Sequence, residues 1–247
     1  MTIKAAFFDL DDTLVLTGEA DKRAFAALSA LAKSKNAAVD TDALITAFKK
    51  RFKATPWDVT YKVEVTEWRA GMWLESLQEQ NINDKELADA IQKCFDDTRL
   101  GDFPFIPGTK EMLASFKERG VKVVIITNGH HFIQHEKLKA CKAADLFEYI
   151  IVGGDEVLAG RKEKPDAGIF QKACAMAGVS AEEAVHVGDS LSTDVQGGIN
   201  AGLAATIWVS KSLADPPAEG PQPTFTVRTA TETIDCIDKL EQRPVEE

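Results

Sequence analysis

Two aspartates spaced two residues apart follow a short apolar run near the start of the chain. Residues 3–8 read IKAAFF, and the segment DLDDT that comes next contains Asp9 and Asp11. In an extended chain, residues i and i+2 point to the same side, so both carboxylates can face one site. One could attack a substrate as a nucleophile while the other moves protons. A polar turn with solvated acids is the alternative interpretation of this segment alone.

Polar residues also follow the next two apolar runs. Thr127-Asn128-Gly129 offers a hydroxyl, an amide and backbone N–H groups, which suit a bound anion near the start of a helix; a simple cap and turn is the alternative. Lys164 precedes Pro165, whose ring restricts the backbone, so this lysine could be a fixed positive charge. A solvated basic loop is the alternative for the lysine.

A fourth apolar run ends in Gly188-Asp189-Ser190, with Asp194 following. Hard cations such as magnesium prefer carboxylate oxygens, so Asp189 could bind a metal ion and Asp194 could support it. Helix capping is the alternative role of these residues. The strand ends therefore carry, in chain order, two carboxylates, an anion site, a lysine and a metal ligand. Together these groups predict phosphate chemistry.

The elements that position these residues alternate between strand and helix. Strands are expected at 3–8, 121–126, 149–152, 184–187 and 205–209, and helices at 132–141, 167–177, 193–201 and 231–240. This alternation predicts an α/β fold with a doubly wound, parallel, Rossmann-like sheet. Ligands bind at the carboxyl ends of the strands in such sheets, which is where the polar residues lie.

Residues 19–99 have a different pattern, with apolar residues at helical spacing. They predict an inserted all-helical cap domain, with residues 1–18 and 100–247 forming the core. Trp57, Trp68, Trp73 and the phenylalanines of this insert are expected to form its own hydrophobic core.

The net charge of −10 disfavours a nucleic-acid surface. Four cysteines without metal-ligand spacing indicate reduced thiols, and no segment reads as a signal peptide or membrane anchor, so we expect a cytoplasmic protein with no membrane partner. His131 and His135 lie four residues apart without the glutamate of an HExxH motif, which argues against zinc.

Four sites resemble, in order, the four motifs of the haloacid dehalogenase superfamily: DLDDT at 9–13, Thr127, Lys164-Pro165, and Gly188-Asp189 with Asp194. Phosphatases of the superfamily have an aspartate at the position of Asp11, whereas its dehalogenases do not. The resemblance implies a phosphatase that forms an aspartyl phosphate, with Asp9 as nucleophile, Asp11 as general acid and then base, and Lys164 neutralising charge. It also implies that Mg²⁺ is bound by Asp9, by the backbone carbonyl of Asp11 and by Asp189.

The remaining residues implied by the resemblance hold the substrate or support the site: Thr127, Asn128 and Gly129 for phosphate, Thr13 for the loop, and Asp194 behind the metal. Longer segments, including TDVQGGINAG and RKEKPDAGIF, resemble phosphatases that act on a phosphorylated sugar acid. The carboxylate of such a substrate suits an arginine, either in the insert or at Arg161 on a core loop. The implied partner is a small phosphate ester, and the protein is expected to be a monomer or weak homodimer.

Three other functions remain open on the sequence. A 5′-nucleotidase or a broad sugar and polyol phosphatase would use the same motifs on another leaving group. A non-catalytic phospho-ligand binding protein would be expected to lack the nucleophile or the metal aspartate, and both are present. A signalling receiver domain places its phosphorylated aspartate at the end of a central strand, and its fold has no long helical insert.

Overall fold

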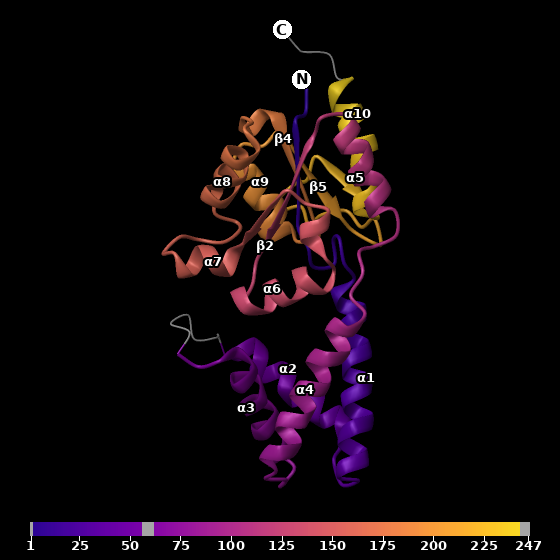
Figure 1. Ribbon diagram of the computed structural model, residues 1–247, viewed down its shortest axis with the longest axis vertical. Helices are drawn as coiled ribbons and strands as arrows, with labels where there is room; N and C mark the ends of the chain where they lie inside the picture. The colour runs from indigo at the N-terminus through magenta and orange to yellow at the C-terminus, as the bar shows by residue number, and fades with distance from the viewer. Residues whose placement is uncertain (1, 56–61, 243–247) are drawn as a thin grey trace. The chain divides into compact units, whose positions relative to one another are not determined.

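The computed structural model describes residues 2–55 and 62–242. The chain divides into two compact units, Met1–Leu16 with Pro104–Glu247, and Thr17–Phe103. Figure 1 shows the first unit as a sheet with helices and the second as a group of helices.

The first unit, the core, is built on a six-stranded sheet with the order β3-β2-β1-β4-β5-β6, in which every neighbouring pair is parallel. The strands are β1 Ala5–Phe8, β2 Lys122–Thr127, β3 Tyr149–Val152, β4 Ala184–Gly188, β5 Ala205–Val209 and β6 Phe225–Val227. The predicted fold class is confirmed. The chain passes from β1 outward to β3 and then returns to β4 beside β1, so the strand order reverses between β1 and β4. A ligand site is expected at the carboxyl ends of these two strands.

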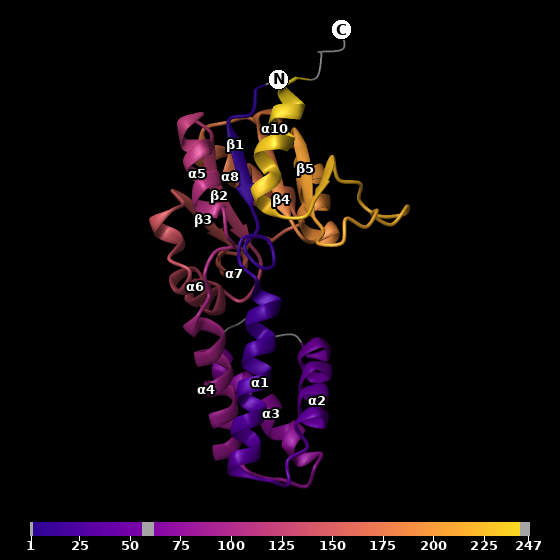
Figure 2. The ribbon, with the colours of Figure 1, turned by 90° about the vertical axis from the view of Figure 1, so that its right-hand side faces the viewer.

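Helices cover both faces of the sheet, with α5 and α10 on one face and α8 and α9 on the other (Figures 1 and 2). The α-helices of the core are α5 Thr109–Glu118, α6 His131–Ala140, α7 Gly153–Leu158, α8 Ala167–Ala177, α9 Gln196–Asn200 and α10 Thr233–Glu241. Phe7 and Ile126 of the sheet pack with Phe170 of α8 in a fully buried cluster. Because apolar side chains cover both faces, the central strands read as continuous apolar runs.

The second unit, the helical unit, consists of four helices in the residues that the structure describes, α1 Thr17–Lys35, α2 Thr41–Ala54, α3 Val65–Gln78 and α4 Lys85–Gly101. Asp40 and Asp84 cap α2 and α4 by accepting backbone N–H bonds. Trp73 is fully buried, stacks on Phe48 with ring centroids 3.6 Å apart, and donates from Nε1 to Gln92 Oε1 at 3.0 Å. Trp68 packs against this cluster, whereas Trp57 lies outside the described residues.

All four cysteines are free thiols. Across residues 2–55 and 62–242, the structure contains no helix that combines the length and the apolar character needed to cross a bilayer.

Candidate active site

The loop after β1 positions the two aspartates that follow it. The backbone N–H of Asp9 donates to Val187 O at 2.8 Å, which continues the pairing of β1 with β4. The carbonyl of Leu10 then accepts from Leu14 N at 3.0 Å and Val15 N at 3.1 Å, which closes a tight turn. Asp12 has a left-handed backbone with φ of 53°, a conformation that aspartate tolerates better than most residues. The turn therefore fixes Asp9 and Asp11 at the carboxyl end of the central strand.

Lys164 joins Asp9 to the end of β4. Its buried ammonium donates to Asp9 Oδ1 at 2.8 Å, to Asp194 Oδ1 at 2.6 Å and to Ile126 O at 2.7 Å. Burial alone would lower the pKa of Lys164, but the charges of Asp194 and Asp9 raise it above its usual range. The lysine is therefore a permanent cation between two buried carboxylates.

Asn128 holds the backbone of Lys164 through two hydrogen bonds. Its Nδ2 donates to Lys164 O at 2.7 Å, and its Oδ1 accepts from Lys164 N at 3.0 Å. Gly129 follows with φ of 126°, which is accessible to glycine and strained for other residues, and its N–H donates to Glu163 Oε2 at 3.2 Å. The segment after β2 therefore aligns the loop that carries the catalytic lysine candidate.

Asp194 lies against the carboxyl end of β4 because Gly188 leaves room for it. A Cβ atom at Gly188 would lie 2.2 Å from Asp194 Cγ. Oδ1 of Asp194 also lies 2.9 Å from Nε2 of the buried His186, and Oδ2 accepts from Ser190 N at 3.0 Å. Burial alone would raise the pKa of Asp194, but Lys164 and the hydrogen bond to His186 lower it below its usual range.

Asp9, Asp189 and Asp194 form an acidic cluster, with one carboxylate oxygen from each lying within 4.8 Å of the others. Burial is the main cause that raises the pKa of Asp9, with repulsion from Asp194 and Asp11 adding to it. Although Asp189 is exposed as a residue, desolvation of its carboxyl group, followed by repulsion from Asp194 and Asp12, raises its pKa to about 6. Crowded carboxylates, two of which (Asp9 and Asp189) have raised pKa values, fit a hard divalent cation, which would relieve the repulsion.

Asp11 has partners that the sequence analysis missed. Its Oδ1 and Oδ2 accept from Lys137 Nζ at 2.7 and 2.8 Å, and Oδ2 also accepts from Gln134 Nε2 at 2.8 Å. The same Gln134 nitrogen lies 2.6 Å from Thr127 Oγ1 and 2.6 Å from Asn128 O. Both Gln134 and Lys137 are buried, on α6. Asp11 is thereby linked to the polar residues at the end of β2.

Comparison with known proteins places the chain in a family. Residues 3–202 match the model of the haloacid dehalogenase-like hydrolases. The chain belongs to this family. It is 33% identical to the N-acylneuraminate-9-phosphatase of Rattus norvegicus over 243 residues, which cover 95% of this chain and 96% of the rat protein. It is also 29% identical to the glyceraldehyde 3-phosphate phosphatase of Pyrococcus furiosus, over 83% of this chain and 80% of that one.

A solved structure shows the same fold. The 2-haloacid dehalogenase from Pseudomonas syringae pv. Tomato DC3000 superposes with a TM-score of 0.67 over 96% of this chain and 99% of its own, at 24% identity. The chain is a phosphatase. Its family is that of haloacid dehalogenase-like hydrolases, and phosphatases resemble it along most of its length.

The structure describes the surroundings of three further residues that are predicted for the site. Arg161 forms an ion pair with the buried carboxylate of Glu156, with Nε 2.5 Å from Oε2, so its side chain is held by α7. The N–H of Gly129 donates to Glu163, as described above. Thr13 is buried, and its hydroxyl has no hydrogen-bond partner among residues 2–55 and 62–242. His135 pairs with Asp155 at 2.8 Å.

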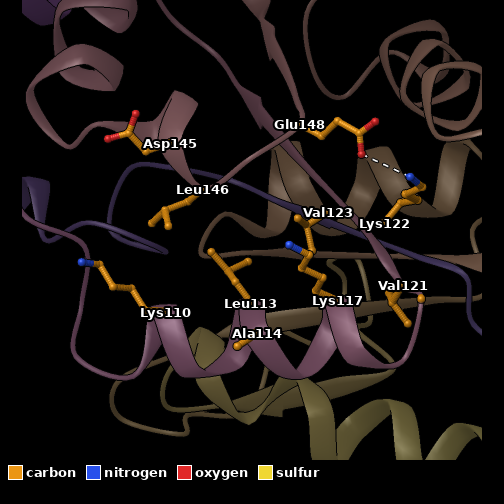
Figure 3. Close-up of a pocket in the computed structure, with 11 residues that line it drawn as sticks. Lys110, Leu113, Ala114, Lys117, Val121, Lys122, Val123, Asp145, Leu146 and Glu148 are labelled. Carbon is orange, nitrogen blue, oxygen red and sulfur yellow. Dashed lines mark hydrogen bonds and ion pairs between the residues drawn. The ribbon is translucent and has the colours of Figure 1, made fainter.

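A cavity of about 500 Å³ lies in the core beside α5 and the amino-terminal end of β2 (Figure 3). Leu113, Val123 and Leu146 provide apolar lining, and lysines also line the cavity, among them Lys122, which pairs with Glu148 at 3.2 Å. Lys122 begins β2, whereas Thr127 ends it, so this cavity is at the end of the strand away from the aspartates. The acidic cluster at the carboxyl ends remains the candidate active site.

Proposed function

We propose that this phosphatase hydrolyses the phosphate monoester of a sugar acid, with N-acylneuraminate 9-phosphate as the first candidate. The observation that carries the proposal is the identity of 33% to N-acylneuraminate-9-phosphatase over 95% of this chain. That span includes the helical unit as well as the core. We propose that this unit acts as a cap that selects the substrate and excludes water during transfer.

In the first step, an Oδ atom of Asp9 attacks phosphorus and the bond to the ester oxygen breaks. The leaving alkoxide is a strong base, so a proton from Asp11 assists its departure by roughly a hundred- to ten-thousand-fold. Lys137 and Gln134 hold the carboxyl group of Asp11 in a fixed position. The product of this step is an aspartyl phosphate on Asp9.

In the second step, Asp11 takes a proton from a water molecule that attacks the aspartyl phosphate. Phosphate leaves, and the carboxylate of Asp9 is restored. Splitting the hydrolysis in this way replaces one difficult step by two easier ones. Lys164 offsets negative charge in both steps because its ammonium is within hydrogen-bond distance of Asp9.

The donor set supports Mg²⁺ as cofactor, held by Asp9, Asp189 and the backbone carbonyl of Asp11. Both oxygens of Asp194 already accept hydrogen bonds from Lys164 and Ser190, which supports a role behind the metal ligands rather than among them. A bound Mg²⁺ would supply charge neutralisation between the carboxylate of Asp9 and the phosphate dianion. The residues Asp189 and Asp9 would orient this ion, and Lys164 would hold Asp9 in line.

A comparison of kcat/KM across phosphate esters tests the proposed substrate. N-acetylneuraminate 9-phosphate should exceed glyceraldehyde 3-phosphate, a sugar or polyol phosphate and nucleoside 5′-monophosphates by at least about ten-fold. Glyceraldehyde 3-phosphate is included because a phosphatase of that substrate is 29% identical over 83% of this chain. If a nucleotide or a simple triose or polyol phosphate is hydrolysed fastest, the sugar-acid assignment is wrong while the phosphatase mechanism stands.

A further inference from the structure

His186 is a buried titratable residue of the core that the two phosphoryl-transfer steps do not use. It lies on the central strand β4 and is 1% exposed. Its ring packs edge-on against Phe170, with the ring centroids 4.9 Å apart. Burying a polar ring costs free energy unless hydrogen bonds compensate. Its hydrogen bond to Asp194 is therefore the feature that can explain a histidine at this place.

The hydrogen bond between His186 and Asp194 has one direction. Nε2 of His186 lies 2.9 Å from Oδ1 of Asp194. Burial would raise the pKa of Asp194, but Lys164 and His186 lower it below its usual range, so the carboxyl group is ionised and can only accept. Nε2 therefore carries the proton and donates. Burial also lowers the pKa of His186, so the ring is a neutral donor at neutral pH.

The two oxygens of Asp194 face different parts of the site. Oδ2 accepts from the backbone N–H of Ser190 at 3.0 Å, next to the candidate metal ligand of this strand. Oδ1 accepts from Lys164 Nζ at 2.6 Å as well as from His186. The same ammonium donates to Asp9 Oδ1 at 2.8 Å. His186 therefore acts on the oxygen that faces the nucleophile, not on the one that faces the metal ligand.

His186 is a firmer anchor for Oδ1 of Asp194 than Lys164 is. The carboxylate torsion of an aspartate is soft, and the four-carbon chain of a lysine is flexible, so these two side chains could shift together. His186 has a short side chain on a strand that is paired on both sides, with β1 and with β5. Ile126 O holds the ammonium at one point, at 2.7 Å, and the anchored carboxylate supplies the second point that aims it at Asp9.

We propose that His186 is a positioning residue of this phosphatase, which fixes Oδ1 of Asp194 so that this carboxylate holds the Lys164 ammonium against Asp9. It acts through these residues and takes no part in phosphoryl transfer itself. The inference rests on the proposed function through the roles given there to Asp9 and Lys164. It is independent of which phosphate ester is the substrate.

The test compares His186→Met with His186→Gln. The two new side chains have similar size and shape, and both lack the ring, but only glutamine carries an N–H donor that can reach Oδ1 of Asp194. The substrate is p-nitrophenyl phosphate at saturating Mg²⁺. His186→Met should lower kcat about ten-fold with a change in KM below about two-fold, because a hydrogen bond to a charged group is lost. His186→Gln should recover kcat to within about three-fold of the unmodified protein.

Thr206→Val is the matched control for the loss of a buried polar group. Thr206 is 3% exposed and pairs in register with His186 on the neighbouring strand, and its hydroxyl lies 3.4 Å from Thr224 N. This variant should lose stability in urea unfolding and keep kcat. All rates are compared per folded molecule. If His186→Met does not fold, His186→Asn takes its place, because its shorter amide does not reach Oδ1; it should lower kcat as methionine does.

The Mg²⁺ requirement separates the two sides of Asp194. The Mg²⁺ concentration that gives the half-maximal rate should change by less than about two-fold in His186→Met, since the bond from Ser190 to Oδ2 is kept. A raised Mg²⁺ requirement with an unchanged kcat at saturation would place His186 on the metal side and overturn the proposal.

The remaining results are equally decisive. An unchanged kcat in His186→Met, or an equal loss in His186→Met and His186→Gln, would reduce His186 to a packing role and overturn the proposal while the proposed function stands. Lys164→Met is measured in parallel. If it keeps the kcat of the unmodified protein, the role of Lys164 in the proposed mechanism is wrong, and the inference about His186 is wrong with it.

Discussion

Replacement of Lys164 by methionine should destabilise the core more than any surface charge change of the same kind. The side chains of Lys164, Asp9 and Asp194 are exposed by only 1%, 9% and 2%. Methionine fills a similar volume, so the main effect is the loss of the cation between two buried carboxylates. Removal of one partner from a buried ion pair costs about 3–5 kcal/mol. We expect a value near the lower limit, about 3 kcal/mol, because Asp9 has a raised pKa and can take up a proton.

Urea unfolding of Lys164→Met and the unmodified protein, without added metal, measures this loss as a change in midpoint at constant slope. Lys85→Met is the control, because Lys85 pairs with Asp89 on an exposed helix face; it should leave the urea midpoint almost unchanged. Adding Asp194→Asn to Lys164→Met should restore part of the loss, since it removes one of the stranded charges. A loss below about 1 kcal/mol for Lys164→Met would refute the electrostatic account of this centre.

The difference between the two proteins should also depend on pH in a defined direction. The pKa of Asp194 is lowered in the folded protein, so its pairing stabilises the fold above the unfolded value of 3.8 and is lost as pH falls through the folded value. The contribution of Lys164, whose pKa is raised, is complete below its unfolded value of 10.5. The destabilisation should therefore be constant between about pH 5 and 7 and should shrink below about pH 4. It should grow above about pH 8, where Asp9 ionises beside Lys164 but not in its absence.

Three further predictions concern the surroundings of Asp9. Activity should require Mg²⁺ and be lost in excess chelator, and Ca²⁺ should inhibit because its larger coordination shell misplaces the nucleophile. Asp189→Ala should raise the Mg²⁺ concentration that is needed for the half-maximal rate. Full activity in chelator would reject the metal assignment. Lys137→Met should lower kcat about ten-fold or more with a smaller effect on KM. Lys139→Met, at an exposed position of α6, is the control and should change neither constant. Equal effects of the two variants on kcat would reject a role for the Lys137–Asp11 pair. Gly188→Ala should displace Asp194 and lower stability by about 1–3 kcal/mol in urea unfolding. Gly71→Ala is the control and should be neutral or stabilising, because no neighbouring atom outside its own helix lies within 4 Å of the added methyl group. An unchanged urea midpoint for Gly188→Ala would contradict the packing argument.

The strands and their polar ends could be predicted because two local signals agree. Runs such as VKVVII are apolar on both faces, as buried parallel strands are, and the polar residues begin where each run stops. β6 could not be found in this way, since it has three residues at the edge of the sheet. The preceding proline-rich stretch gave only the signal of a loop.

The partners of Asp11 show where sequence reasoning fails at the site. Lys137 lies on α6 between Glu136 and Leu138, and a lysine at this place in a helix is most often solvated. Its burial depends on where α6 begins after Gly129, which local pattern does not determine. Arg161 is a second example. Its position near Lys164 predicts a contact with substrate, and that stays a prediction; local pattern does not indicate its ion pair with the buried carboxylate of Glu156, five residues away.

The formation of a covalent phosphoenzyme at Asp9 is the central claim, and a rapid-quench single turnover tests it most directly. The Asp11→Asn variant should be used with p-nitrophenyl phosphate, whose leaving group needs no proton, so that the phosphoenzyme forms but its hydrolysis lacks a base. Mass spectrometry of the acid-quenched peptides should find phosphate on Asp9, and none should form in Asp9→Asn. Turnover without phosphate on Asp9 at any time point, or phosphate on a different residue, would contradict the account.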